Sequence, residues 1–168
     1  MIRVSTRGRY ALRAMIDLAL HVDQGPVLRQ EIARRQEISA DYVAQLFRSL
    51  HEAGLVKGVK GPGGGYTLAR DPATITALDI IQAVEGPVAV VQCVLPEEEP
   101  TCNRVDRCVT YLLWKRLSAM ISDALGAVTL QDLCDEARRL ESSTTPAIGH
   151  GVGGEPSCTW PLPNQQTN

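Results

Sequence analysis

The stretch that decides the fold runs from residue 28 to residue 68 and reads LRQEIARRQEISADYVAQLFRSLHEAGLVKGVKGPGGGYTL. A short helical pattern through Leu28 and Ile32 is followed by a tight turn at residues 36–38, and Ser39 can then cap a second helix. The inward positions of that second helix are Val43, Leu46, Phe47 and Leu50. Two helices joined by such a short turn predict a helix-turn-helix, whose second helix can enter the major groove of DNA.

Two short alternating segments, 55–60 and 66–68, follow Gly54 and predict a pair of strands. The turn between them is Gly61-Pro62-Gly63-Gly64-Gly65, where bare backbone amides and Lys60 can approach an anion. A phosphate loop of a nucleotide-binding protein is the competing interpretation of a glycine run. The run joins two strands instead of opening a helix, and no Gly-Lys-Ser/Thr follows, so we interpret the hairpin as the wing of a winged helix-turn-helix.

Helical patterns continue on both sides of this unit. Upstream, Ser5 or Thr6 can cap a helix that ends before Gly25-Pro26. Downstream, capping boxes at residues 76–79 and 129–132 each open a helix. Between them a long helix is predicted from Cys108 to about residue 125. Its apolar stripe consists of Val109, Leu112, Leu113, Leu117, Met120, Ile121 and Leu125. A lone helix rarely exposes that much apolar surface, so we expect it to pack against its own domain and against the same helix of a second subunit.

The predicted fold class is therefore mainly α: a winged helix-turn-helix with a small β-hairpin wing, plus a long C-terminal dimerisation helix. Four segments are expected. Residues 1–86 form the DNA-binding domain, 87–107 a cysteine loop, 108–140 the dimerisation helix with a terminal helix, and 141–168 a disordered tail rich in Ser, Thr, Gly, Pro, Gln and Asn.

Charge is distributed unevenly along the chain. Residues 1–70 contain 11 Lys and Arg against 6 Asp and Glu, whereas residues 71–168 contain 6 against 13. A basic amino-terminal part beside an acidic remainder is typical of a polyanion-binding module joined to a regulatory part. No apolar stretch approaches the length that crosses a bilayer, and no signal-peptide pattern begins the chain, so a cytoplasmic protein without a membrane partner is expected.

Three cysteines, Cys93, Cys102 and Cys108, lie close together in a proline-interrupted segment. Such a loop can bring soft sulfur ligands onto an iron–sulfur cluster, a zinc ion or a redox switch. Zinc is the weaker interpretation because the spacing lacks paired C-x-x-C motifs. Cys134 falls in an apolar helical pattern and is expected in the core.

Three further fragments, taken in order, identify a resemblance: Gly8-Arg9-Tyr10-Ala11, the wing sequence through Tyr66, and Leu113-Trp114. Over residues 1 to about 140 the chain resembles the IscR-type regulators of the Rrf-type winged-helix family, which carry an iron–sulfur cluster. The resemblance implies a homodimer on roughly palindromic double-stranded promoter DNA, with the long helices crossing at the interface.

The resemblance also implies that Cys93, Cys102 and Cys108 bind the cluster, as a 2Fe-2S or alternatively a 4Fe-4S centre. In IscR a histidine three residues after the last cysteine is the fourth ligand. This chain has Tyr111 at that position, so the fourth ligand and the cluster type stay open.

The residues expected to contact DNA follow from the docking geometry of a recognition helix, whose amino-terminal part meets base edges and phosphates. Gln45 is the best base reader, because its amide donates and accepts at once and so matches adenine. Arg48 and Lys60 are expected on phosphates, and Gly63 and Gly64 let the wing approach the minor groove. The candidate DNA-contacting residues are Ser39, Asp41, Tyr42, Gln45, Arg48, Lys60, Gly63 and Gly64.

The function that these observations favour is a sequence-specific transcriptional regulator that senses iron–sulfur cluster status, redox state or iron. A thiol-switched regulator without a cluster and an iron–sulfur carrier are the alternatives. An enzyme is not expected, because no catalytic constellation occurs in the sequence.

Overall fold

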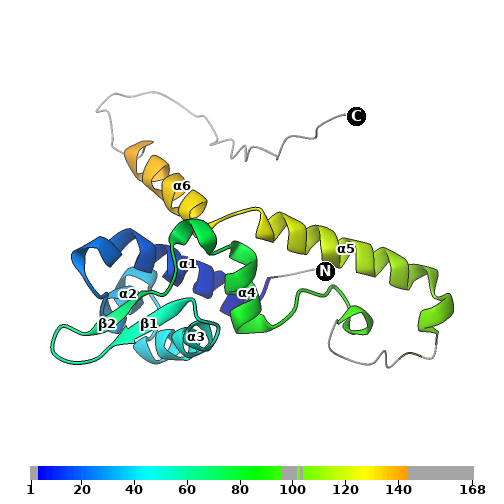
Figure 1. The fold of residues 1–168 in the computed structure, drawn as a ribbon, viewed down its shortest axis with the longest axis horizontal. Helices are drawn as coiled ribbons and strands as arrows, with labels where there is room; N and C mark the ends of the chain where they lie inside the picture. Colours follow the sequence, from blue (N-terminus) through cyan, green and yellow to red (C-terminus); the bar gives the residue numbers. More distant parts are fainter. Residues whose placement is uncertain (1–3, 96–101, 103, 144–168) are drawn as a thin grey trace.

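The computed structural model of the protein describes residues 4–95, 102 and 104–143. The amino-terminal body contains four helices and a two-stranded antiparallel sheet, and α5 extends from it as an arm (Figure 1). The helices are α1 (Thr6–His21), α2 (Arg29–Gln36), α3 (Ala40–Glu52), α4 (Ala77–Glu85), α5 (Val109–Gly126) and α6 (Leu130–Ser143). The strands are β1 (Val56–Val59) and β2 (Gly65–Leu68). The prediction of a mainly helical winged helix-turn-helix is confirmed.

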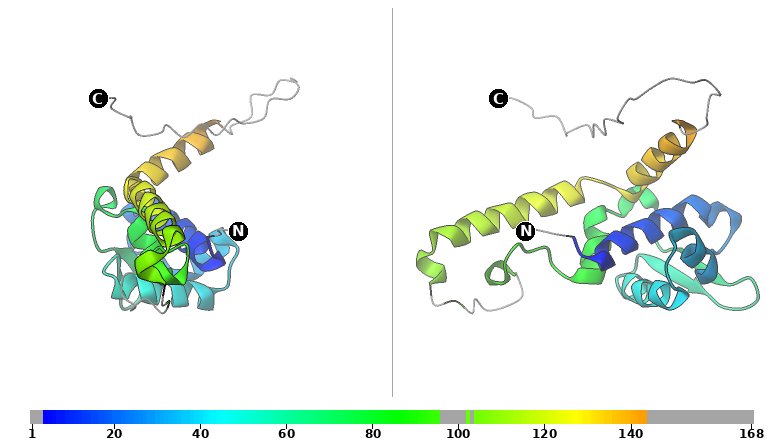
Figure 2. Two further views of the ribbon diagram at one scale, coloured as in Figure 1. Left: turned by 90° about the vertical axis from the view of Figure 1, so that its right-hand side faces the viewer. Right: turned by 180° about the vertical axis from the view of Figure 1, so that it is seen from behind.

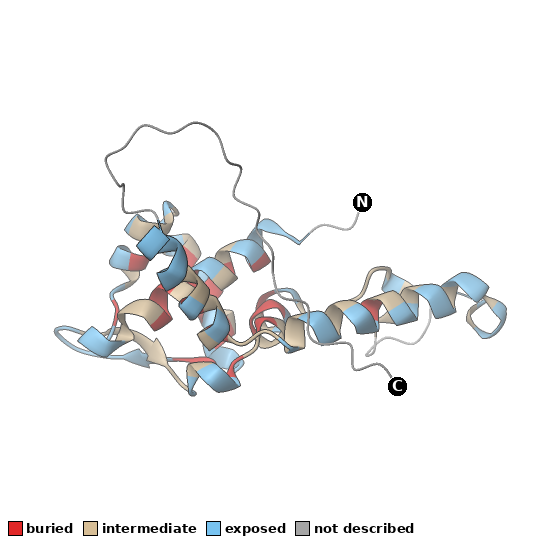
Figure 3. Cartoon of the chain, turned by 90° about the horizontal axis from the view of Figure 1, so that it is seen from above, coloured by how far each residue is buried: buried red, intermediate tan, exposed pale blue. Residues whose placement is uncertain are grey.

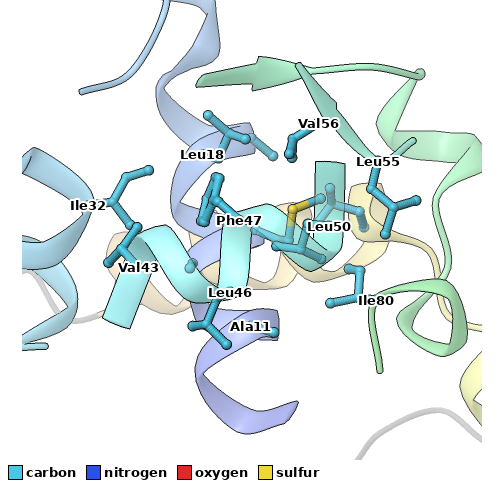
Figure 4. Packing of buried hydrophobic residues seen from close by; sticks show 14 of the residues in the cluster. Ala11, Leu18, Ile32, Val43, Leu46, Phe47, Leu50, Leu55, Val56 and Ile80 are labelled. Atoms are coloured by element: carbon cyan, nitrogen blue, oxygen red, sulfur yellow. The ribbon is translucent and has the colours of Figure 1, made fainter. Parts of the chain in front are cut away.

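The core of the body gathers around α3. Its four predicted inward residues, Val43, Leu46, Phe47 and Leu50, are all buried, and Figure 4 shows them beside side chains of α1, α2 and α4. Burial of large apolar side chains is the main favourable term in folding. Cys134 of α6 belongs to the same cluster, as its helical pattern predicted.

The wing is tied to the rest of the body at Tyr66. Its ring lies 4.4 Å from the ring of Phe47, centroid to centroid. Its backbone pairs with Val27 through hydrogen bonds of 2.8 and 2.9 Å, so the segment before α2 lies beside β2. The hairpin register, in which Val56 faces Leu68 and Val59 faces Gly65, is therefore fixed against the helices as well as within the sheet.

Helix ends follow the predicted caps, with small differences. Ser5 caps α1, and Ser39 caps α3 by accepting from the amide of Tyr42. Both capping boxes form, at Thr76 with Asp79 and at Thr129 with Asp132. Leu28 was expected within the helical pattern, but it is the residue before α2 and is 43% exposed, whereas Val27 is buried in the core.

The arm formed by α5 leaves much of its apolar stripe uncovered (Figure 3). Val109 is 82% exposed and Leu112 is 66% exposed, whereas the buried Ser118 faces the segment that follows α4. Beyond α5 the chain returns to the body, where α6 packs on α1 (Figure 2). Among the described residues, no helix is both long and apolar enough to span a bilayer. The tail was predicted to begin at residue 141, but α6 continues to Ser143. The rest of the predicted tail, residues 144–168, lies outside the described residues.

Candidate functional site

The outer face of α3 carries the polar residues that the sequence assigned to it. Ser39, Asp41, Gln45 and Arg48 are exposed, while the opposite face of the helix is buried. Arg48 forms no ion pair with any residue that the structure describes. The helix therefore offers an amide and a guanidinium to an outside partner on one continuous face.

Tyr42 differs from the other members of this set. It is half-buried and packs against the core, with its ring in an edge-to-face contact with Tyr10 at 6.0 Å and 88°. The contact joins α1 to α3, which are far apart in sequence, so the sequence pattern did not reveal it. Its ring is held by α1, so Tyr42 is both a surface residue and a part of the packing.

The wing exposes Lys60 and Gly63, and Gly63 adopts a left-handed backbone with φ of 77°. Gly64 is also needed to close the turn of the wing. A Cβ built on Gly64 would lie 2.3 Å from the carbonyl oxygen of Val59, so the turn closes only because no side chain is present. The groove between the wing and the start of α2 is lined by Arg29, His51 and Lys60 among others.

The turn of the helix-turn-helix carries a network that sequence reasoning missed. Asp17 of α1 is buried, and Arg35 donates to both of its carboxylate oxygens at 2.8 Å. Gln36 also donates to Asp17, at 3.1 Å, and Arg13 donates to Gln36. A buried charged residue on an otherwise apolar helix face was the available signal, because such residues are almost always paired.

The segment that contains the cysteines begins directly after α4. Cys93 lies in a 3-10 turn, Gln92–Val94, and is half-buried; Cys102 is exposed; and Cys108 is the residue before α5. The amide of Val90 donates to the hydroxyl of Ser118 at 3.1 Å, which fixes the approach to Cys93 against α5. An apolar hollow beside this contact is lined by Leu12 of α1, Ile81 of α4 and Trp114 of α5.

Cys108 occupies a polar environment. Its sulfur lies 3.1 Å from the hydroxyl of Thr110, and the backbone amide of Tyr111 and the charge of Arg104 lie nearby. The hydrogen bond from Thr110 is the main cause that lowers the pKa of the Cys108 thiol below its ordinary value, with the Tyr111 amide next. A thiol with a lowered pKa is a better metal ligand and a better nucleophile, since both reactions need the thiolate.

The three loop cysteines fit an iron–sulfur group by their chemistry but are not gathered into one site. Over residues 4–95, 102 and 104–143, no three His, Cys, Asp or Glu side chains come close enough to hold a metal ion. Pro96 and Pro100, between Cys93 and Cys102 in sequence, lie outside the described residues. Tyr111 is half-buried at the first turn of α5.

Comparison with known proteins places these features in context. The Rrf2 family, described as iron-dependent transcriptional regulators, matches residues 4–136. The HTH-type transcriptional regulator IscR of Vibrio parahaemolyticus is 39% identical over 165 residues, which is 96% of both chains. IscR of Xenorhabdus nematophila is 43% identical over 132 residues, 79% of each chain.

Two solved structures share the fold and much of the sequence. CymR, the global cysteine regulator of B. subtilis, has a TM-score of 0.66 and 40% identity, covering 81% of this chain and 98% of its own. IscR of T. potens has a TM-score of 0.67 and 35% identity, covering 89% of this chain and 94% of its own. The family and the two IscR relatives found by sequence are described as transcriptional regulators, as the helix-turn-helix pattern predicted.

Proposed function

Because the chain belongs to the Rrf2 family and is a transcriptional regulator, not an enzyme, we propose that it reads promoter DNA with α3 and its wing, under control of the cysteine segment. The single observation that carries the DNA-reading part is the exposed polar face of α3, which presents Gln45 and Arg48 opposite the buried apolar residues of the same helix.

DNA contacts divide into two kinds. Gln45 reads base edges, with Ser39, Asp41 and Tyr42 at the amino-terminal end of the helix, where a recognition helix meets the major groove. Arg48 and Lys60 hold phosphates, since neither has an ion-pair partner among the described residues. Gly63 and Gly64 keep the wing turn slim enough to approach the minor groove.

We propose that Cys93, Cys102 and Cys108 hold an iron–sulfur cluster, 2Fe-2S or 4Fe-4S. The names of the IscR relatives, the description of the family as iron-dependent and the lowered pKa of the Cys108 thiol support this assignment. When bound, the cluster would supply a redox- and iron-sensitive group. The chain's own contribution is to present thiolates on a segment clipped to α5 by the bond between Val90 and Ser118.

We further propose that the protein acts as a homodimer through α5. One face of the arm exposes four apolar side chains by at least half: Val109, Leu112, Leu113 and Met120. Exposing this much apolar surface to water is unfavourable, and a second subunit packed on it would bury that surface. A two-fold dimer presents two recognition helices to half-sites about one helical turn of DNA, ~34 Å, apart. A palindromic promoter site is then the natural target.

The experiment that tests the function combines DNA selection with spectroscopy. Anaerobically purified wild type and the Cys93/Cys102/Cys108 triple alanine variant are compared, with Cys134→Ala as the matched control because this cysteine is buried away from the segment. Iron and sulfide are quantified per subunit, and bound genomic fragments are sequenced. A brown wild type whose selected sites change in the triple variant supports the proposal. Identical DNA selection by both proteins contradicts cluster control, and no selection contradicts DNA reading.

A thiol switch without a cluster is the second candidate. It is favoured by the acidic thiol of Cys108 and by the likeness to CymR, which is described as a global cysteine regulator. This candidate predicts a colourless, iron-free protein whose DNA binding changes on mild oxidation and is restored by a thiol reductant.

A further inference from the structure

The turn between α2 and α3 contains a residue in a conformation that a side chain disfavours. Glu37 has φ of 56° and ψ of 43°, the left-handed region, and is the one non-glycine residue with positive φ among those described. The backbone N–H of Glu37 donates to the carbonyls of Ala33 and Arg34, and these hydrogen bonds close the end of α2. Glycine occupies such a position without steric cost, so a glutamate there needs support from its surroundings.

That support comes from α1, through Gln36. Arg13 donates from Nε to Gln36 Oε1 at 3.0 Å and from Nη2 to the Gln36 backbone carbonyl at 3.2 Å. The amide nitrogen of Gln36 donates in turn to Asp17 at 3.1 Å. The residue directly before the left-handed turn is therefore held at both its side chain and its backbone.

The same guanidinium is linked to the start of α3 through Tyr10 of α1. It lies 5.2 Å from the centroid of the Tyr10 ring, within the range of a cation–π contact. Tyr10 contacts Tyr42 edge to face, and Tyr42 lies in the first turn of α3. Arg13 is thus connected to the end of α2 and to the beginning of α3, the two sides of the turn.

We propose that Arg13 is a positioning residue for DNA reading: it clamps the turn so that α3 presents Gln45 at the angle the major groove requires. This inference rests on the proposed DNA-reading function of α3. The competing role is a direct phosphate contact, because Arg13 is itself exposed. The two roles differ physically, since a phosphate contact needs only a cation, whereas the clamp needs the planar fork of an arginine.

The test measures the dissociation constants of the full-length chain for a selected promoter duplex and for a scrambled duplex over a series of salt concentrations. Wild type is compared with Arg13→Lys, Arg13→Ala, Glu37→Gly and the double variant Arg13→Lys/Glu37→Gly. Arg138→Lys serves as the matched control, because its bond to Asp135 is local to α6. Thermal melts of every variant report the fraction folded.

If Arg13 acts as a clamp, we expect Arg13→Lys to raise the dissociation constant for the promoter duplex roughly tenfold, which is within the range of coupling energies between residues in contact. The dissociation constant for the scrambled duplex and the salt slope should stay unchanged. In the Glu37→Gly background, Arg13→Lys should weaken promoter binding by less, because glycine adopts the left-handed conformation of the turn without steric cost. The clamp is overturned if Arg13→Lys binds the promoter duplex as tightly as wild type does. It is also overturned if Arg13→Ala lowers the salt slope by about one and weakens binding to both duplexes equally. A lower melting temperature with unchanged affinity overturns it as well. A wild type that does not discriminate the duplexes overturns the proposed function and this inference together.

Discussion

Ser5 Oγ donates a hydrogen bond of 2.7 Å to Glu85 Oε1, and so joins the start of α1 to the end of α4. The same hydroxyl accepts from the amides of Arg7 and Gly8 at 3.0 and 3.2 Å. A Cβ on Gly8 would lie 2.1 Å from Glu85 Oε1, so the absence of a side chain there permits the contact. Ser5 therefore caps α1 and also binds Glu85, the last residue of α4, after which the cysteine segment begins.

Replacing Ser5 by Ala should lower the free energy of unfolding by about 1 kcal/mol, the usual cost of losing an N-cap. Urea unfolding of the full chain measures the change. Ser142→Ala is the control, because its hydroxyl donates to the carbonyl of Arg138 within the same helix, at the exposed end of α6. Equal stability of the two variants would show that the Ser5 contacts contribute nothing measurable.

Gly65→Ala should destabilise the wing by about 2 kcal/mol, within the range found for overpacking. A Cβ on Gly65 would lie 2.4 Å from the carbonyl oxygen of Val27, a backbone atom that cannot move aside without breaking its bond to Tyr66. Gly58→Ala on the paired strand is the matched control, since its Cβ position has no non-adjacent described residue within 4 Å. Thermal melting compares them, and a similar loss in both variants would contradict the steric account.

Gln45→Ala and Arg48→Ala should weaken DNA binding in different ways. Loss of a base-reading amide should remove about 1–3 kcal/mol of discrimination at one base pair, with the salt dependence unchanged. Loss of a phosphate contact should weaken all sequences alike and lower the salt slope by about one. Titrations against a set of single-base variants of the selected site separate the two effects. If Gln45→Ala lowered the salt slope and Arg48→Ala removed discrimination at one base pair, the proposed roles of the two residues would be exchanged.

Thr110→Ala should move the alkylation profile of Cys108 to higher pH. The Thr110 hydroxyl is the main cause that lowers the pKa of this thiol, so its removal leaves less thiolate at neutral pH. The measurement is the iodoacetamide rate against pH in metal-free protein with Cys93, Cys102 and Cys158 replaced by Ser. Cys134 is an internal control: burial raises the pKa of its thiol, and it should stay unmodified until the chain unfolds. An alkylation profile that Thr110→Ala leaves unchanged would show that another group lowers the pKa of the Cys108 thiol.

Leu112→Glu should shift the protein toward the monomer. A carboxylate on the exposed apolar face of α5 would have to be desolvated without a partner in the proposed interface, a cost of several kcal/mol. Gln82→Glu adds the same charge at an exposed position on α4 and serves as the control. Sedimentation velocity at several concentrations reads the outcome, and a Leu112→Glu dimer as stable as wild type would place the interface elsewhere.

Local patterns in the chain were reliable guides to its elements. Helical spacing identified the buried face of α3, and Ser39 and the two capping boxes set helix starts, because both signals act over only a few residues. The glycine run identified the wing turn for the same reason. These features also account for Gln45 and Arg48, whose exposure follows from the face of the helix on which they lie.

Contacts between distant segments could not be read in this way. The left-handed Glu37 stands where glycine would be expected, and it is supported by Arg13, which lies on another helix. Tyr42 was expected to contact DNA from the start of α3, and the sequence did not reveal that its ring also meets the ring of Tyr10 edge to face. No local rule pairs such residues, since their proximity exists only after α1, α2 and α3 pack together.

The sequence by itself determined the order of the helices, the wing and the exposed polar face of α3, because periodicity, caps and glycine turns are properties of neighbouring residues. Only the tertiary structure decided how α1 holds the turn through Arg13 and how Ser5 meets Glu85. Those contacts depend on packing angles between helices, which are set by the shape of the whole core and by no single segment.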